Sequence, residues 1–358
     1  MAVNATPATA DEFAERLFGA ALGMVDMLAV FLGDRLGWYQ ALADGGPATA
    51  EELVSRAGGA PRYAQEWLEQ QACTGILTVG EDGRFALAEG AAEILTDPTS
   101  LSFLAPLARM FGAAAVQMPA LLEAYRTGGG VSWERFGVDM RESQADMNRP
   151  WFEHRLADAL AAVSEIDAVL RRPGARIADV GCGGGWSSIA LARAYPEATV
   201  DGYDVDAPSV ELASANAASA GLDGRVAFHR VDGASLGAGD GPGYDAIFAF
   251  ECIHDMPRPV EVLAGMRRAL APDGVAVIMD EAVAETFAPP GDDTERLMYG
   301  FSLFICLPDG LSSQPSAGTG TVMRRAVLDR YAREAGFQGA DVLPIDDFGF
   351  WRFYRLPT

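Results

Sequence analysis

The part of the sequence best suited to binding a ligand is a glycine-rich run that follows a short apolar segment. From Asp179 to Trp186 the chain reads D-V-G-C-G-G-G-W, with glycine at the alternating positions Gly181, Gly183 and Gly185. Glycine lets the backbone turn tightly and approach a ligand closely, and the free N–H groups of a following helix attract anionic groups. The run therefore predicts a loop that binds a nucleotide-like cofactor.

Two kinds of cofactor use such a loop. The dinucleotide pattern G-x-G-x-x-G begun at Gly181 needs glycine at position 186, where the chain has tryptophan, whereas G-x-G-x-G is complete. NAD is therefore the weaker interpretation. Within the run, Cys182 is interpreted as a small packing residue rather than a nucleophile. Asp179 either contacts the cofactor or only orients the N–H groups of the loop.

Two further acids follow the next predicted strands. Asp204 ends the second strand, where a carboxylate accepts hydrogen bonds from both hydroxyls of a ribose, and Asp206 is a second candidate. After the third strand, Asp232 and Gly233 form a loop in which a carboxylate would accept a hydrogen bond from an adenine amine. Together these residues predict a ribose-and-adenine site.

The elements that must position these residues are strands alternating with helices. From Arg176 onward, short apolar runs alternate with helices of about 10–15 residues, which is typical of an α/β, doubly wound parallel sheet with its ligand at the carboxyl ends of the strands. The predicted strands cover 177–180, 199–204, 226–231, 244–251 and 275–280.

The first hundred residues follow a different pattern. A helix with an apolar stripe is predicted from Asp11 to Leu32, and Thr49-Ala-Glu-Glu is a capping box that begins a short helix. A helix over 62–74 and two short strands, 75–79 and 84–87, follow it. This order of helix, helix and hairpin is typical of a winged helix.

The charge of the chain disfavours nucleic acid as a partner. The sequence has no lysine and a net charge of −23, and residues 1–110 contain 6 Arg and 15 Asp plus Glu, or −9. Because such a surface repels phosphates, we expect the winged helix to serve dimerisation or to cover substrate. A ligand-sensing winged-helix transcriptional regulator remains the alternative from another class.

We divide the chain into a winged-helix dimerisation domain (1–98), a helical bridge (99–170) and a catalytic domain (171–358). The four cysteines lack metal-binding spacing, so a reducing cytoplasm is expected. The apolar stretch from Phe18 to Leu32 is interrupted by Asp26 and falls short of the ~20 apolar residues of a membrane span. No membrane anchor is predicted.

These motifs resemble those of class I S-adenosylmethionine-dependent methyltransferases. The resemblance rests on D-x-G-x-G-x-G from Asp179, on Asp204 and Asp232, and on L-A-P-D-G at 270–274. With the winged helix, the bridge and A-G-F at 335–337, the chain is similar to dimeric, plant-type small-molecule O-methyltransferases.

The resemblance implies S-adenosyl-L-methionine as cofactor and a homodimer formed mainly by the N-terminal helices. It also implies a Rossmann-like sheet of about seven strands whose last, antiparallel strand lies near 350–356. The cofactor contacts that it implies are Asp179, Gly181, Cys182, Gly183, Gly185, Asp204, Val205, Asp232, Gly233, Phe250 and Glu251.

His254 is the predicted catalytic residue. It follows the fourth strand, at the edge where the cofactor's methyl group would project, and His254-Asp255 resembles the general-base pair of the plant-type enzymes. Those enzymes add acids that flank the base, but the later loop here reads G-T-G-T at 318–321. Glu281 or Glu285 is a possible substitute. A purely structural histidine that hydrogen-bonds the loop is an equally weighted alternative.

We predict no metal. His254 and Asp255 offer two ligands of the kind found in keto-acid C-methyltransferases, but no histidine follows position 254 to supply a third.

The acceptor is expected to be a small, largely apolar, hydroxylated molecule. The apolar segment 301–310 and the turn-rich segment 312–320 are interpreted as a wall and lid of its pocket. Aromatic and methionine side chains of the bridge complete that pocket or belong to the core: Trp133, Phe136, Met140, Met147, Trp151 and Phe152. N- or C-methylation, which needs no strong base, remains the alternative reaction.

Overall fold

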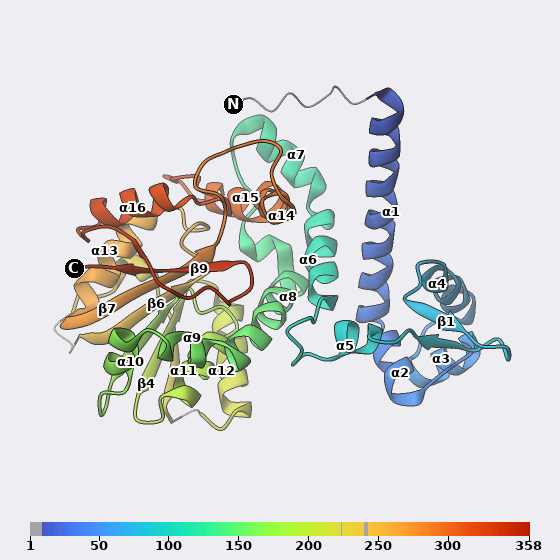
Figure 1. The fold of residues 1–358 in the computed structure, drawn as a ribbon, viewed down its shortest axis with the longest axis horizontal. Coiled ribbons are helices and arrows are strands. Elements are labelled where there is room, and N and C mark those ends of the chain that lie inside the picture. Colours follow the sequence, from blue (N-terminus) through green and yellow to red (C-terminus); the bar gives the residue numbers. More distant parts are fainter. Residues whose placement is uncertain (1–8, 223, 240–242) are drawn as a thin grey trace. The chain divides into compact units, whose positions relative to one another are not determined.

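The structure, a computed structural model, describes residues 9–222, 224–239 and 243–358 (Figure 1). The chain forms two compact units, 1–112 and 113–358. Their boundary lies inside helix α6 (Ala105–Val116) rather than at the predicted positions 98 and 170, so most of the predicted bridge belongs to the second unit. The three-part functional division remains a prediction.

The first unit contains the elements predicted for the N-terminal region. Thr9 and Thr49 each accept a hydrogen bond from the backbone N–H three residues later and form capping boxes. β1 pairs antiparallel with β2, and the core contains Trp38, Tyr39 and Trp67. The helix–helix–hairpin order is confirmed, and the winged-helix assignment stays a prediction. The elements are α1 (Ala10–Arg35), α2 (Trp38–Gly45), α3 (Ala50–Ala57), α4 (Pro61–Cys73), β1 (Leu77–Val79), β2 (Phe85–Leu87) and α5 (Ala91–Thr96).

Helix α1 exposes most of its apolar side chains within this unit. Only Val30 and Gly33 of its 26 residues are buried, while Leu17 and Phe18 are 74% and 67% exposed. By length and composition α1 is also apolar enough to cross a membrane, which corrects the expectation that this stretch is too short. The apolar face therefore needs a partner or a membrane to cover it.

The second unit contains the predicted sheet, which has seven strands in the order β5-β4-β3-β6-β7-β9-β8. β9 pairs antiparallel with β7, as expected for the last strand, whereas β3 to β7 pair in parallel. Each predicted strand is present within a few residues of its expected bounds. The strands are β3 (Arg176–Val180), β4 (Thr199–Asp204), β5 (Val226–Arg230), β6 (Tyr244–Phe250), β7 (Leu270–Glu281), β8 (Asp341–Val342) and β9 (Trp351–Leu356).

Helices cover both faces of this sheet (Figure 1). One face packs on α9 (Leu156–Ala161), α10 (Ser164–Leu170), α11 (Trp186–Ala194) and α12 (Ala207–Ser219). The other packs on α13 (Pro259–Ala269), α16 (Arg325–Glu334) and the 3-10 turn η1 (Gly233–Ser235). The strands are nearly continuous apolar runs because both faces are covered.

Further helices lie outside the alternating strands and helices of the sheet, one group before β3 in the sequence and one after β7. Residues 118–154, within the predicted bridge, are helical as expected and form α7 (Met118–Thr127) and α8 (Trp133–His154), with a break in α8 at Gly137, whose φ is 79°. The segment interpreted as a pocket wall is helical: α14 (Asp293–Phe301), the π-helix η2 (Ser302–Cys306) and α15 (Leu307–Leu311). π-helical turns are often found at functional sites.

Candidate active site

The glycine run is a loop between β3 and α11 that only glycine can form. Gly181, Gly183 and Gly185 have φ angles of 73°, 49° and 78°, in the left-handed region that other residues avoid. A side chain at Gly185 would also lie 2.6 Å from the ring of Phe228. The predicted backbone-lined binding loop is therefore present.

Asp179 lies below this loop and is completely buried. Its Oδ2 accepts hydrogen bonds from the hydroxyls of Ser187 and Ser188, both at 2.6 Å, at the beginning of α11. Burial raises the pKa of Asp179 to about 6. These contacts favour the alternative in which Asp179 organises the loop rather than touching the cofactor.

Asp204 joins the second strand to the loop. Its carboxylate accepts hydrogen bonds of 2.9 Å from the backbone N–H of Gly183 and from that of Asp206. Burial raises its pKa. Asp206 instead caps α12 through Ser209 and binds Arg141 through two hydrogen bonds of 2.6 and 2.9 Å. The structure thus brings Asp204 to the glycine loop, as predicted.

The remaining predicted cofactor residues differ in their surroundings. Cys182 is buried, and burial raises its thiol pKa well above the usual value, which agrees with a packing role. Asp232 begins η1 at Gly233 and pairs with Arg258 at 2.9 Å. Val205 is 63% exposed. Asp232 and Val205 do not line the cavity at the loop.

That cavity has a volume of about 80 Å³ and lies between the glycine loop and α8. Phe250 and Glu251, at the end of β6, line it together with Gln144 and Asn148 of α8. A side chain at Gly184 would meet Ala145 at 2.7 Å, so α8 packs directly on the loop.

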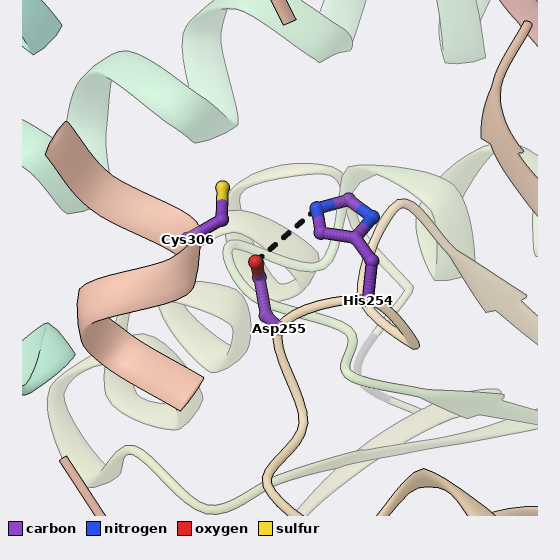
Figure 2. A group of neighbouring side chains, drawn as sticks. All are labelled: His254, Asp255 and Cys306. Carbon is purple, nitrogen blue, oxygen red and sulfur yellow. Dashed lines mark ion pairs between the residues drawn. The ribbon is translucent and has the colours of Figure 1, made fainter. Parts of the chain in front are cut away.

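His254 lies at the carboxyl edge of the sheet, 2% exposed. Its Nδ1 is 2.9 Å from Asp280 Oδ1 and 3.2 Å from Glu281 Oε2, and its Nε2 is 3.2 Å from Asp255 Oδ1. Figure 2 shows His254 and Asp255 on neighbouring positions of one loop, with Cys306 on the adjacent helix. Both ring nitrogens therefore face carboxylates.

The charges around His254 determine its protonation. Burial alone would lower its pKa, but Asp255, Asp280 and Glu281 together raise it well above the usual value. Glu281 is itself buried, and its pKa is raised well above the usual range. The three acids therefore favour the protonated form of the imidazole.

Comparison with known proteins agrees with this geometry. Residues 177–274 match a family described as a methyltransferase domain. The chain contains a methyltransferase domain over these residues. The match runs from β3 to β7 and includes the glycine loop, Asp204 and His254.

A known protein is also similar in sequence to part of this chain. The chain is 32% identical over 143 residues to the 27-O-demethylrifamycin SV methyltransferase of Amycolatopsis mediterranei, covering 40% of this chain and 50% of that protein. The chain thus spans about half the length of this relative.

Two solved structures share the fold over almost their whole length. Mitomycin 7-O-methyltransferase has a TM-score of 0.70 at 20% identity, covering 96% of this chain and 97% of that one. Human N-acetylserotonin methyltransferase, solved with S-adenosylmethionine, has a TM-score of 0.72 at 16% identity, covering 98% and 99%.

The sequence analysis missed or left open two acids and a thiol that lie around His254. Asp280 was not considered, and of the two proposed substitutes Glu281 contacts His254 whereas Glu285 pairs with Arg352. A conspicuous signal was available, because Asp280-Glu281 ends the central apolar strand β7. Cys306 is a buried thiol beside His254 that gave no signal in the sequence.

The sequence argument against a metal depended on the lack of a third ligand. His254 with Asp280 and Glu281, or with Asp255 and Cys306, places three potential ligand atoms within 4.8 Å of one another. That argument therefore fails, although the carboxylates already bind both ring nitrogens of His254.

The predicted aromatic pocket is mostly core. Trp151 contacts Phe348 and Trp351, and Phe152 contacts Phe250. Phe136 and Met140 are buried as well, whereas Trp133 and Phe152 line the cavity at the glycine loop. Asp309, in the helical wall, accepts the backbone N–H of Trp133 at 2.7 Å, and its burial raises its pKa to about 7.

Proposed function

We propose that the chain is an S-adenosylmethionine-dependent methyltransferase that methylates a hydroxyl group of a small, largely apolar acceptor. The observation that carries this proposal is the hydrogen bond from Gly183 N–H to Asp204, which fixes a ribose-binding acid against a loop of backbone N–H groups. The rifamycin and mitomycin relatives named above are O-methyltransferases and support the natural-product class of acceptor.

In this reaction, different residues of the chain would bind the cofactor and accept the proton. The glycine loop and Asp204 would hold the cofactor, which supplies an electrophilic methyl group on a sulfonium. The acceptor oxygen attacks that methyl, the carbon–sulfur bond breaks, and the hydroxyl proton passes to the base. Proximity and in-line orientation provide most of the acceleration, because the sulfonium is already a good leaving group.

We assign the base to His254 with its partner Asp255. A histidine in this role contributes about 10²–10⁴-fold. Since its pKa is raised well above the usual value, the unprotonated form that accepts the proton is populated only at alkaline pH or after substrate displaces a carboxylate. N- or C-methylation is the second candidate, because both ring nitrogens are already engaged by acids.

Isothermal titration calorimetry tests the cofactor assignment. Purified chain is titrated with S-adenosylhomocysteine and with NAD, and we expect binding of the first only. Titration heat with NAD alone would reject the proposal. The proposed reaction needs no metal, so dialysis against EDTA should leave the turnover of a hydroxylated aromatic acceptor unchanged.

We also propose that the chain forms a homodimer in the cytoplasm. The exposed apolar face of α1 is the surface that supports a dimer, and the free thiols of all four cysteines support a reducing compartment. The regulator alternative is less favoured because residues 1–110 carry a net charge of −9. Sequence-selective binding in a gel-shift assay would revive it.

A further inference from the structure

One ring nitrogen of His254 lies beside a carboxylate and a thiol. Nε2 of His254 is 3.2 Å from Oδ1 of Asp255, and Cys306 lies next to this pair on η2 (Figure 2). Ligand atoms of the three side chains all lie within 4.8 Å of one another. An imidazole nitrogen, a carboxylate oxygen and a cysteine sulfur are the donors that bind zinc in proteins. The group is therefore suited to a zinc ion.

The spacing of the nitrogen and the oxygen agrees with tetrahedral coordination. Zinc binds nitrogen and oxygen at about 2.0–2.1 Å, which places two of its ligands about 3.3–3.4 Å apart. The 3.2 Å between His254 Nε2 and Asp255 Oδ1 is close to that separation. An ion bound to both atoms therefore requires little movement of either side chain.

The other ring nitrogen of His254 has the contacts of a metal-binding histidine. Nδ1 lies 2.9 Å from Asp280 Oδ1 and 3.2 Å from Glu281 Oε2. A histidine that binds a metal almost always donates its second ring N–H to a carboxylate, a carbonyl or water, which fixes the orientation of the ring. Asp280 and Glu281 thus orient His254 so that Nε2 faces Asp255.

The carboxylate of Asp255 has an oxygen that is free to coordinate. Its Oδ1 is buried and, among the residues that the structure describes, accepts no hydrogen bond of good geometry. A buried charged oxygen of this kind requires a cation. His254 and Cys306 are 2% and 9% exposed, whereas the side chain of Asp255 is 29% exposed, so an ion would enter from the side of Asp255.

We propose that His254 Nε2, Asp255 Oδ1 and Cys306 Sγ bind a zinc ion that inhibits methyl transfer. The site itself stands on the geometry above. Its inhibitory effect rests on the proposed function, because the ion occupies the nitrogen that would accept the hydroxyl proton. Zinc replaces the protons of the thiol and of Nε2, which pass to solvent. The thiolate and the carboxylate then balance the two positive charges of the ion, and water completes the coordination.

Cobalt spectroscopy on the full, metal-free chain tests the site. Co²⁺ binds the same nitrogen, oxygen and sulfur donors as Zn²⁺, and a thiolate ligand gives it a sulfur-to-metal charge-transfer absorption. We expect this absorption in the unaltered chain, at one equivalent of Co²⁺, and its loss in Cys306→Ser. The matched control is Cys73→Ser, which changes an exposed thiol on α4 and should leave the absorption unchanged.

Displacement of Co²⁺ by Zn²⁺ gives the affinity for zinc. We expect Cys306→Ser to lower it by at least about 10–100-fold, since even the groups that orient a metal ligand contribute that much. Asp255→Asn should lower it as well and provides a second variant if Cys306→Ser fails to fold by circular dichroism.

Turnover of a hydroxylated aromatic acceptor tests the inhibition. Saturating Zn²⁺ should lower the turnover of the unaltered chain by about 10²-fold or more, the contribution of a general base, and EDTA should restore it. Relative to its own metal-free rate, Cys306→Ser should need at least about 10-fold more Zn²⁺ for the same inhibition.

The outcomes separate this proposal from the proposed function. A charge-transfer absorption that is absent in the unaltered chain, or retained in Cys306→Ser, would overturn the zinc site. Zinc that binds at Cys306 without lowering turnover would overturn its inhibitory effect. A chain that binds zinc but not S-adenosylhomocysteine would refute the proposed function and leave the site in place.

Discussion

The buried carboxyl group of Asp179 should make the stability of the protein depend on pH. The pKa of its carboxyl is raised to about 6 by burial, so the folded state disfavours the charged form, and stability falls as pH rises from about 4 to 6. We expect Asp179→Asn to increase the free energy of unfolding by up to about 3 kcal/mol at pH 8 and to have little effect at pH 4.

Urea unfolding at the two pH values measures this difference. Retained affinity of the variant for S-adenosylhomocysteine would support the loop-organising role. Lower stability than wild type at pH 8 would contradict the sign of the shift.

The second prediction for a single residue concerns the pH dependence of catalysis by His254. A general base acts unprotonated, and because its pKa is raised, kcat/KM should increase with pH above 7. Asp280 is one of the acids responsible, so Asp280→Asn should shift the rising limb of the pH profile to lower pH. An unshifted limb in this variant would mean that another group titrates.

Removing the imidazole separates the two candidate reactions. His254→Ala should lower turnover by about 10²-fold or more if His254 accepts a hydroxyl proton, with little change in S-adenosylhomocysteine affinity. Near-normal turnover would favour N- or C-methylation, for which no strong base is needed. Because removing a buried histidine leaves acids unpaired, folding of the variant should be checked by circular dichroism.

At the scale of elements, α8 is tied to the cofactor side of the sheet by Arg141. Its two hydrogen bonds to Asp206 are largely shielded from solvent, since the two side chains are 10% and 12% exposed. We expect Arg141→Met to lower the free energy of unfolding by about 1–3 kcal/mol and to accelerate amide hydrogen exchange in residues 133–146.

The exposed pair of Arg126 with Glu123, 3.8 Å apart, provides the control. Arg126→Met should change stability by less than about 0.5 kcal/mol. If exchange in α8 is the same in both variants, the Arg141 pair does not fasten this helix.

The elements were predictable from the sequence to different degrees. The strand at 246–250 (A-I-F-A-F) was predictable because a buried parallel strand is a short apolar run between turns. The segment 301–310 was interpreted only as an apolar pocket wall, with no secondary structure assigned, and it forms helices. Periodicity alone does not distinguish helix from strand in a short apolar run.

The site was predictable where a motif lies within one turn. The glycine loop and Asp204 could be paired because strand ends of a parallel sheet meet at one edge. The same rule applies to Asp280 at the end of β7 and His254 after β6, but Asp280 was not considered. Cys306 could not be paired with His254, because it lies 52 positions later on a helix and no local pattern relates the two.

At the scale of the whole molecule, the apolar face of α1 requires an occupant. Its exposed side chains recur about every three to four residues, the spacing of one helix face. They are Phe13, Leu17, Phe18, Leu22, Met24, Val25, Leu28 and Leu32. We propose that a second copy covers this continuous apolar face, and a twofold dimer would place the two copies of α1 against each other.

Light scattering after size exclusion tests this assembly. We expect the mass of a dimer for the unaltered chain at about 10 µM, and that of a monomer for Leu17→Glu combined with Phe18→Glu, because burying two charges in an apolar contact is strongly unfavourable. Tyr63→Glu changes an aromatic residue that is 78% exposed on α4, outside this face, and should leave the dimer intact. A monomeric wild type that sediments with lipid vesicles would instead assign the face of α1 to a membrane surface.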